Sequence, residues 1–191
     1  ALEEPTIELI LKNREEIEQY CKVALPEKES YELANNKRKT IDIAIKVGVP
    51  TPKDYSYINE ESLGAFKFPL IIKPCKSSGS RGLKLIKKKE DFIINYKKAR
   101  ERYGEVLIQE YIDREGEGLG VALLADRGEV KQSFSYKRLR EYPVNGGPGT
   151  LNESTDDPLI KSYSAKLIKE LNWTGVAMVE FKRDLRDNSV K

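Results

Sequence analysis

The sequence predicts an α+β fold, and three observations lead to that prediction. Stretches with apolar residues at helical spacing alternate with short apolar runs that suit strands. Two such runs, 69–72 and 83–86, are joined by a loop of small and basic residues, so both are interpreted as strands of one hairpin. Hydrophobic residues form 39% of the 191 residues, which suffices for one large domain or two small subdomains.

The N-terminal part is predicted to form two helices. Pro5 suits the first turn of the first helix. A loop at 24–27 leads to Asn35 and Asn36, either of which is a plausible N-cap of the second helix, and Gly48 ends that helix. The residues predicted to face the core are Ile7, Ile10, Leu11, Ile17 and Cys21 in the first helix and Ile41, Ala44 and Ile45 in the second.

The middle of the chain is predicted to be a hairpin, a helix and a further strand. The hairpin strands span 70–73 and 83–86, the helix starts near Asp91 and closes at Gly104, and the next strand spans 106–111. One face of this helix carries Phe92, Tyr96, Ala99 and Tyr103.

The C-terminal part is predicted to contain three strands and one helix. Strands at 118–124 and 130–136 join at the turn 126–128, and a glycine-rich loop follows at 145–150. Asp157 as N-cap and Pro158 at the first position open the helix, and a strand at 175–181 runs into a charged hairpin. The helix core face is predicted to be Leu159, Ile160, Tyr163, Leu167, Ile168 and Leu171, with Asn172 at its end.

Composition excludes several classes of function. Thirty-four basic and 31 acidic residues nearly cancel, so neither a nucleic acid nor a membrane surface is an expected partner. The chain has no histidine, so catalytic triads and histidine-ligated metals are excluded and the chemistry must come from Lys, Arg and carboxylates. Cys21 and Cys75 are far apart and lack metal-ligand spacing, and no signal peptide or long apolar run is present, which predicts a cytoplasmic protein.

The loop 73–82 carries the strongest functional signal. Its small residues let successive backbone N–H groups approach an anion, and Lys73, Lys76 and Arg81 supply positive charge, so the loop suits the phosphates of a nucleotide. The loop joins two strands and lacks the spacing of the P-loop and of the dinucleotide fingerprint. A solvated basic hairpin tip is the alternative interpretation.

Taken in order, the string 68–74 with its loop, the string 107–112 and Val179-Glu180-Phe181 resemble the ATP-grasp superfamily. The match runs from about residue 35 to 191 and is most similar to the branch of biotin carboxylase, carbamoyl-phosphate synthetase and D-alanine ligase. Asn36-Lys37, Ala44 and the string 48–52 strengthen it.

The resemblance implies an ATP-grasp fold in which two α+β subdomains clasp ATP. Residues 1–34 would be the tail of a preceding domain, 35–111 the N-terminal subdomain and 112–191 a truncated C-terminal subdomain. Lys37 and Lys73 would reach the phosphates, with a role for Lys73 in catalysis as well. A mobile lid from Ser77 to Arg81 would cover them, and its residues Ser77, Ser78, Gly79 and Ser80 would bind the nucleotide.

The resemblance also assigns the other binding residues. The hinge residues Gln109, Glu110 and Ile112 would read the adenine edge, and Glu117 would accept hydrogen bonds from the ribose hydroxyls. Glu180 would bind Mg²⁺.

Arg138 or Arg140 would hold the substrate carboxylate or the transferring phosphoryl group, and Arg138 is the predicted catalytic residue. The loop 146–150 would lie across the cleft. A surface lysine at 37, a solvated carboxylate at 110 and a solvated basic turn at 138–140 are the alternatives from the residues alone.

The predicted function is an ATP-dependent ligase that activates a small-molecule carboxylate as an acyl phosphate for attack by an amine. Carboxyphosphate chemistry of the carbamoyl-phosphate synthetase or biotin carboxylase kind is one alternative, and a non-catalytic nucleotide-binding module is another. An RNA-contacting domain is disfavoured because no aromatic platform accompanies the basic residues. The family's hairpin with the pattern E-x-N-x-R does not follow Phe181, so the chain is expected to be a fragment of a longer protein. We expect this fragment to bind nucleotide weakly and to turn over poorly. Further domains of the same protein or a homo-oligomer are the expected partners.

Overall fold

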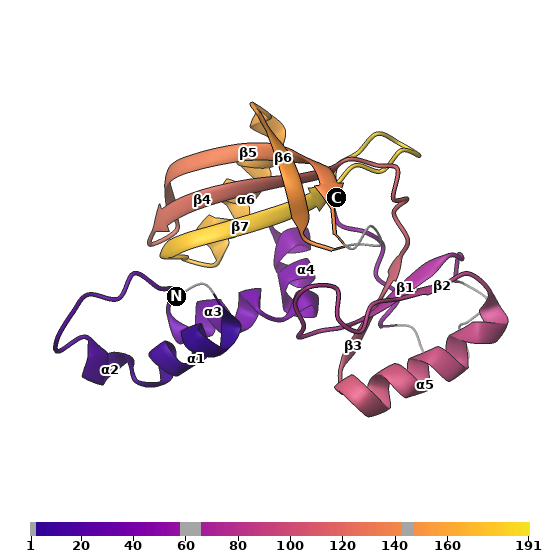
Figure 1. Cartoon of the computed structure of the whole chain (residues 1–191), viewed down its shortest axis with the longest axis horizontal. Coiled ribbons are helices and arrows are strands. Elements are labelled where there is room, and N and C mark those ends of the chain that lie inside the picture. The colour runs from indigo at the N-terminus through magenta and orange to yellow at the C-terminus, as the bar shows by residue number, and fades with distance from the viewer. Residues whose placement is uncertain (1–2, 58–65, 143–146) are drawn as a thin grey trace.

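The computed structural model describes residues 3–57, 66–142 and 147–191. Its described elements form two antiparallel sheets, one of three strands and one of four, with helices packed on them. Figure 1 shows the four-stranded sheet at the top, the smaller sheet at the lower right and helix α4 between them. The predicted α+β class is confirmed, whereas the predicted boundaries after residues 34 and 111 stay predictions.

The N-terminal segment differs from the single long helix that the sequence predicts. It forms α1 (Glu4–Lys12) and α2 (Arg14–Ile17), separated at Asn13. Helix α3 (Lys28–Ala34) follows the predicted loop 24–27, where no helix was predicted. The break is stabilised because Arg14 folds back and donates hydrogen bonds to the carbonyl oxygens of Val23, Leu25 and Pro26. Only Leu11 of the predicted stripe is buried, and Cys21 is exposed outside both helices.

Helix α4 (Lys37–Lys46) begins as predicted at Asn36, whose side chain accepts hydrogen bonds from the N–H groups of Arg38 and Lys39. Its two buried residues belong to different cores. Ile41 packs with Cys75 and Leu107 of the smaller sheet, whereas Ala44 packs in the core of the larger one. The inward placement of Ile45 was wrong, because this side chain is 60% exposed.

The smaller sheet has the order β2–β1–β3, from β1 (Leu70–Pro74), β2 (Lys84–Ile86) and β3 (Val106–Glu110). A short turn of 3-10 helix, η2 (Lys89–Asp91), leads into α5 (Phe92–Tyr103), which packs on β1 and β3. Gly104 ends the helix with a φ of 74°, a conformation that favours glycine. The hairpin, the helix and the third strand all agree with the sequence prediction.

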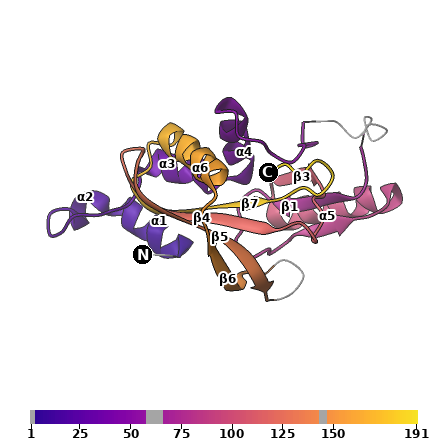
Figure 2. The ribbon, with the colours of Figure 1, turned by 90° about the horizontal axis from the view of Figure 1, so that it is seen from above.

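The larger sheet has the order β6–β5–β4–β7, from β4 (Gly118–Asp126), β5 (Glu129–Glu141), β6 (Gly149–Thr155) and β7 (Gly175–Lys182). Helix α6 (Pro158–Glu170), capped by Asp157 as predicted, lies along one face of this sheet (Figure 2). The core between α6 and the sheet contains Leu119, Val121, Leu123, Ala125, Ile160, Leu167, Ile168 and Phe181.

Two predictions for this sheet need correction. Strand β6 begins inside the predicted loop 145–150 and continues through residues for which no strand was predicted. The strand was missed because its polar side chains follow no apolar alternation and it forms by pairing with the edge of β5. Leu159 is 47% exposed rather than part of the core face of α6. Of the predicted loop 145–150, residues 145 and 146 lie outside the described residues.

Across the described ranges of the chain, none of the helices combines the length and apolar character needed to cross a membrane.

Candidate functional site

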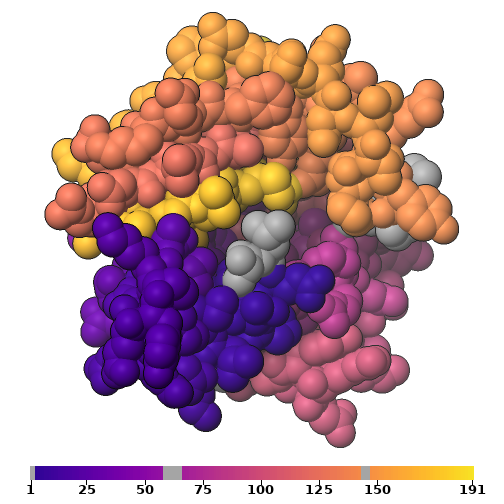
Figure 3. All heavy atoms as spheres, turned by 60° about the vertical axis from the view of Figure 1, so that its left-hand side comes forward, coloured from indigo at the N-terminus to yellow at the C-terminus, as the bar shows by residue number. Residues whose placement is uncertain are grey.

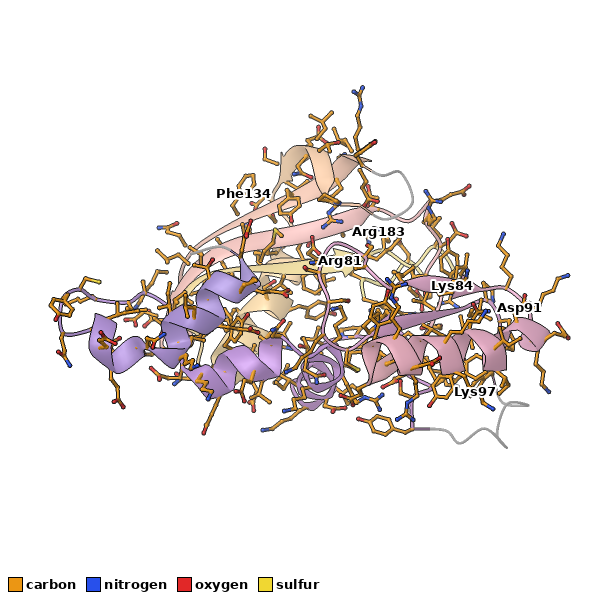
Figure 4. All side chains as sticks on the ribbon, turned by 60° about the horizontal axis from the view of Figure 1, so that its bottom comes forward. Arg81, Lys84, Asp91, Lys97, Phe134 and Arg183 are labelled. Atoms are coloured by element: carbon orange, nitrogen blue, oxygen red, sulfur yellow. The ribbon has the colours of Figure 1, made fainter. Side chains whose placement is uncertain are left out.

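The loop between β1 and β2 contains three residues in the left-handed region of backbone conformation. Gly79, Ser80 and Gly82 all have positive φ, of 59°, 57° and 78°. A side chain at Gly82 would bring its Cβ within 2.6 Å of Pro74 Cγ, so glycine is required there. Arg81 lies on this loop (Figure 4), where its guanidinium donates to the hydroxyl oxygen of Ser78 at 3.2 Å. The predicted hairpin geometry is confirmed, and its use by phosphate stays a prediction.

Two lysines from different elements meet at the base of this loop. Lys73 lies near the end of β1, and Lys37 is the first residue of α4, where its N–H donates to the carbonyl oxygen of Cys75 at 2.9 Å. The Lys37 ammonium donates to the carbonyl oxygen of Ser77 and lies 3.4 Å from the Ser77 hydroxyl oxygen. The sequence prediction that Lys37, Lys73 and Ser77 share one region is therefore consistent with the fold.

Burial lowers the pKa of both lysines. For Lys73, whose residue keeps some exposed surface, desolvation of the ammonium together with the neighbouring charge of Lys37 lowers the pKa to about 8. Burial also lowers the pKa of Lys37, against smaller opposing effects of Glu4 and Cys75. Two desolvated cations that repel each other form a region where an anion is favoured.

The predicted hinge starts at the end of β3. Gln109 is 3% exposed and pairs with Ile71 on one side and with Asp54 on the other. The N–H groups of Glu110 and Tyr111 already donate to the carbonyl oxygens of Lys53 and Pro69, at 2.9 and 3.2 Å. These two N–H groups are therefore committed to the protein, which leaves Ile112, buried at 7% exposure, as the candidate for reading a base through its backbone.

Glu110 itself belongs to a charge cluster that the sequence interpretation missed. Its carboxylate accepts hydrogen bonds from the Lys53 N–H at 2.8 Å, from Arg186 at 2.8 Å and from Lys191 at 3.3 Å. Burial alone would raise the pKa of Glu110, but these three donors together lower it below its ordinary value.

Asp184 is the centre of the same cluster. It is 1% exposed and accepts hydrogen bonds from the Arg186 Nε at 2.8 Å and from the Lys191 ammonium at 2.6 Å. The Arg186 hydrogen bonds, which outweigh burial, hold the pKa of this carboxylate well below its usual range. Because Arg186 lies 76 residues from Glu110 in sequence, no local sequence pattern predicts their contact.

The two charged residues assigned to chemistry lie on the larger sheet and form an ion pair with each other. Arg138 on β5 pairs with Glu180 on β7, and it also lies 3.4 Å from Glu141. Gly118 makes room for this arginine, because a Cβ there would be 3.2 Å from Arg138 Cδ. The predicted basic turn is thus part of strand β5, and Arg140 lies on that strand as well.

Glu117 lies where the chain enters β4. Its carboxylate accepts a hydrogen bond from Arg183 at 3.0 Å, and its carbonyl oxygen accepts one from the Arg183 N–H at 2.9 Å. A ribose contact by Glu117 stays a prediction, and it requires that Arg183 share the carboxylate with the sugar hydroxyls.

The donor set on the larger sheet suits a magnesium ion that arrives with a nucleotide better than an all-protein metal cage. In the described ranges, no group of three or more Cys, Asp or Glu side chains is arranged to hold a metal. Mg²⁺ is commonly held by one or two carboxylates together with phosphate oxygens. Glu180, with 47% of its side chain exposed and with Glu141 on the other side of Arg138, fits that role.

Two hollows in the described part of the chain are lined mainly by the N-terminal helices. One, of about 480 Å³, is lined by charged residues around α1 and α2, and the other, of about 130 Å³, reaches Lys76. We do not place the nucleotide in either, because neither is lined by Lys37, Lys73 or Glu180.

Comparison with known families gives one match that covers most of the chain. A model described as the ATP-grasp domain matches residues 34–180. This range includes the β1–β2 loop, the hinge and Glu180.

Curated relatives agree with that match. A formate-dependent phosphoribosylglycinamide formyltransferase of Prochlorococcus marinus is 26% identical over 190 residues, which cover 93% of this chain and 48% of that protein. A D-alanine–D-alanine ligase of Fusobacterium nucleatum is 28% identical over 154 residues, covering 76% of this chain and 50% of that protein. The chain therefore spans about half the length of the curated relatives it matches.

Solved structures share the fold. The biotin carboxylase of Campylobacter jejuni has a TM-score of 0.77 at 16% identity, covering 96% of this chain and 44% of that one. The D-alanine–D-alanine ligase of Bacillus anthracis has a TM-score of 0.63 at 21% identity, covering 87% of this chain and 56% of that one. Together with the family model, which spans well over half of its residues, these findings show that the chain belongs to the ATP-grasp family.

Proposed function

We propose that the protein is an ATP-dependent ligase that activates a carboxylate as an acyl phosphate and joins it to an amine. One observation carries the proposal: two desolvated lysines, Lys37 and Lys73, meet at the base of an anion-binding loop in a chain of the ATP-grasp family. The relatives whose names state their reactions include ligases and a carboxylase, which supports the assignment to this class.

In the proposed reaction a carboxylate oxygen bonds to the γ-phosphorus of ATP as the bond from that phosphorus to the bridging oxygen of ADP breaks. The amine nitrogen then bonds to the acyl carbon, phosphate leaves, and the amine releases a proton. Lys37, Lys73 and the loop 77–80 orient the phosphates, and Arg138 neutralises charge on the transferred group. Magnesium, when bound with the nucleotide beside Glu180, supplies further neutralisation of the phosphate oxygens.

The rest of the site binds the nucleoside in this proposal. The hinge at Gln109, Glu110 and Ile112 binds adenine, and the backbone of Ile112 forms the hydrogen bonds to the base. Glu117 binds the ribose. The substrates are small molecules, and the site is completed by further domains or by a second copy. The two free cysteines support a location in the reducing cytoplasm.

Calorimetry with Mg-ATP, Mg-ADP and Mg-GTP tests nucleotide binding by the purified protein. We expect saturable, magnesium-dependent binding of adenine nucleotides that is lost when Lys73→Ala and Glu180→Ala are combined. Equal affinity of that variant would remove both residues from the site.

A second measurement separates the ligase from its alternatives. ADP release is followed with an amine and a panel of carboxylates that includes bicarbonate. Release that requires an organic carboxylate supports the ligase, release with bicarbonate alone supports carboxyphosphate chemistry, and tight ATP retention without release supports a non-catalytic module.

A further inference from the structure

One face of the larger sheet carries exposed apolar side chains. Leu124 on β4, Phe134 on β5 and Val176 and Met178 on β7 are between 45% and 59% exposed. We call these four residues the apolar row. The register places them on one face, because Ala122 pairs with both Phe134 and Met178, and Leu124 pairs with Val176.

This face is the one that α6 leaves uncovered. The alternate residues Leu119, Val121 and Leu123 of β4 form the core beneath α6, so Leu124 and its cross-strand neighbours point the other way. Figure 3 shows atoms of the sheet, from salmon to yellow, at the surface above the indigo N-terminal helices. Figure 4 shows Phe134 projecting from β5 into the open.

The apolar row leads directly to the charged pair of the proposed site. Glu180 follows Met178 by two residues on the same face of β7, and Arg138 follows Tyr136 and Phe134 in the same way on β5. Two residues along a strand advance by about 6.6–6.8 Å. The row therefore extends roughly 13 Å from Glu180 to Val176.

Tyr136 joins the charged end to the apolar row and is held in place. Its ring lies over Gly120, where a Cβ would come within 2.4 Å of the ring, so only glycine leaves space for it. Its hydroxyl donates to the Met178 sulfur at 2.9 Å, and its ring stacks on Phe134 with centroids 6.3 Å apart. The row is therefore a continuous apolar surface whose side chains are packed against one another. Single exposed apolar residues scattered over a surface are normal and need no functional explanation.

We propose that the carboxylic acid substrate of this protein carries an apolar group, aromatic or aliphatic, that lies along the apolar row while its carboxylate faces Arg138. This inference rests on the proposed function. Arg138 pairs with Glu180 and Glu141, and in the proposed function magnesium takes over the Glu180 carboxylate. The apolar row then ends at the guanidinium of Arg138, which matches a ligand with an apolar body and one anionic end. A small polar acid such as formate or bicarbonate would leave the row without an occupant.

The single methionine of the sequence allows a direct test, because Met178 is the centre of the row. Protein labelled with ¹³C in the methionine methyl group gives one reporter signal. It is titrated, with Mg-ADP present, with 3-phenylpropionate, acetate and 3-phenylpropanol. We expect a saturable shift with 3-phenylpropionate at an affinity at least tenfold above that of acetate, and weaker binding of the alcohol, which lacks the charge.

Matched variants locate the binding. Phe134→Ser and Val176→Ser alter exposed side chains and should weaken 3-phenylpropionate binding at least threefold, with unchanged thermal midpoints. Ile94→Ser, on α5 and 62% exposed, is the control and should leave the affinity unchanged.

Each other outcome overturns the inference. Bound Mg-ADP without any saturable carboxylate shift would reject the apolar substrate but retain the nucleotide site. Absence of nucleotide binding would reject the proposed function itself. A Met178 shift that depends on protein concentration, with a dimer mass in sedimentation, would assign the row to a second copy of the chain.

Discussion

Burial lowers the pKa of Lys73 to about 8, whereas a phosphate beside its ammonium would favour the charged form. Burial favours loss of the Lys73 ammonium proton, and a bound phosphate favours its retention. Below about pH 8 the free protein already carries this proton, so phosphate binding costs no proton uptake there. Above it, a nucleotide must bind together with a proton, and the affinity must fall as the pH rises.

We therefore expect the affinity for Mg-ADP to decrease above pH 8, by up to roughly tenfold per pH unit. Calorimetry at pH 8.5 in two buffers of different ionisation enthalpy should show proton uptake. Lys73→Met should abolish the uptake and weaken binding by roughly 10- to 100-fold, as expected for a lost charged hydrogen bond. Lys97→Met, which changes an exposed lysine of α5 (Figure 4), should change neither. Proton uptake that persists in Lys73→Met would assign it to another group.

A second residue-scale prediction concerns the ion pair of Arg138 with Glu180. If Glu180 holds magnesium, the arginine competes for its carboxylate. Arg138→Met should then tighten Mg²⁺ binding to the ADP complex by up to about fivefold, the range of a partly exposed pair, while ADP release falls at least tenfold. Lys137→Met, on the same strand and paired with Glu153 at 2.7 Å, is the control. Unchanged Mg²⁺ affinity in Arg138→Met would argue that Glu180 is no ligand.

At the scale of elements, the sequence predicts those that carry their own local signals. Asn36 and Asp157 cap α4 and α6 through side-chain hydrogen bonds within three residues, and Gly104 ends α5, so each is readable from a few neighbours. Strand β6 and helix α3 lack such signals and were missed. Their existence depends on pairing or packing with the neighbouring elements, β5 for the strand and α4 for the helix, which no pattern within β6 or α3 reports.

The hairpin after β7 depends on a partner distant in sequence, since Arg186 and Lys191 bind both Asp184 within the hairpin and Glu110 at the hinge. Asp184→Asn removes the buried charge of this cluster and should lower the free energy of unfolding by about 3 kcal/mol at neutral pH. Because the folded-state pKa of Asp184 is lowered, its stabilisation is present above the ordinary Asp range and lost as the pH falls through the folded pKa. The difference between wild type and variant in urea denaturation should therefore shrink below about pH 4.

Asp187→Asn, on the same hairpin, is the matched control, because an asparagine oxygen can still accept the Ser189 N–H bond that Asp187 now accepts at 2.9 Å. Its effect should stay below about 1 kcal/mol at every pH. If both variants behave alike, the cluster contributes nothing specific to the junction of hinge and hairpin.

At the scale of the whole molecule, the sequence proposes single site residues but not their arrangement. Lys37, Lys73 and Glu180 were identified from motifs, yet the pairing of Arg138 with Glu180 and the commitment of the Glu110 carboxylate required the fold. Sequence patterns report local periodicity and short spacing, whereas ion pairs between strands of one sheet, or between the hinge and the hairpin after β7, depend on how the chain folds. Helix α4 determines much of the packing of the two sheets, because Ile41 and Ala44 enter different cores.

We therefore expect the two sheets to unfold together, and the chain offers one probe for each. Trp173, the single tryptophan, packs against the larger core, and Cys75, 1% exposed, directly follows β1 of the smaller sheet. In a Cys21→Ser background, urea unfolding followed by tryptophan fluorescence and by Cys75 labelling should give one midpoint. Ile41→Ala should lower both midpoints equally, at a cost of about 2–4 kcal/mol, because it opens a cavity where α4 meets the smaller sheet. Ile45→Ala, at an exposed position one turn further along α4, should leave both nearly unchanged. Labelling of Cys75 well before the fluorescence changes would mean that the sheets unfold separately, and closure around a nucleotide would then need contacts that α4 does not supply.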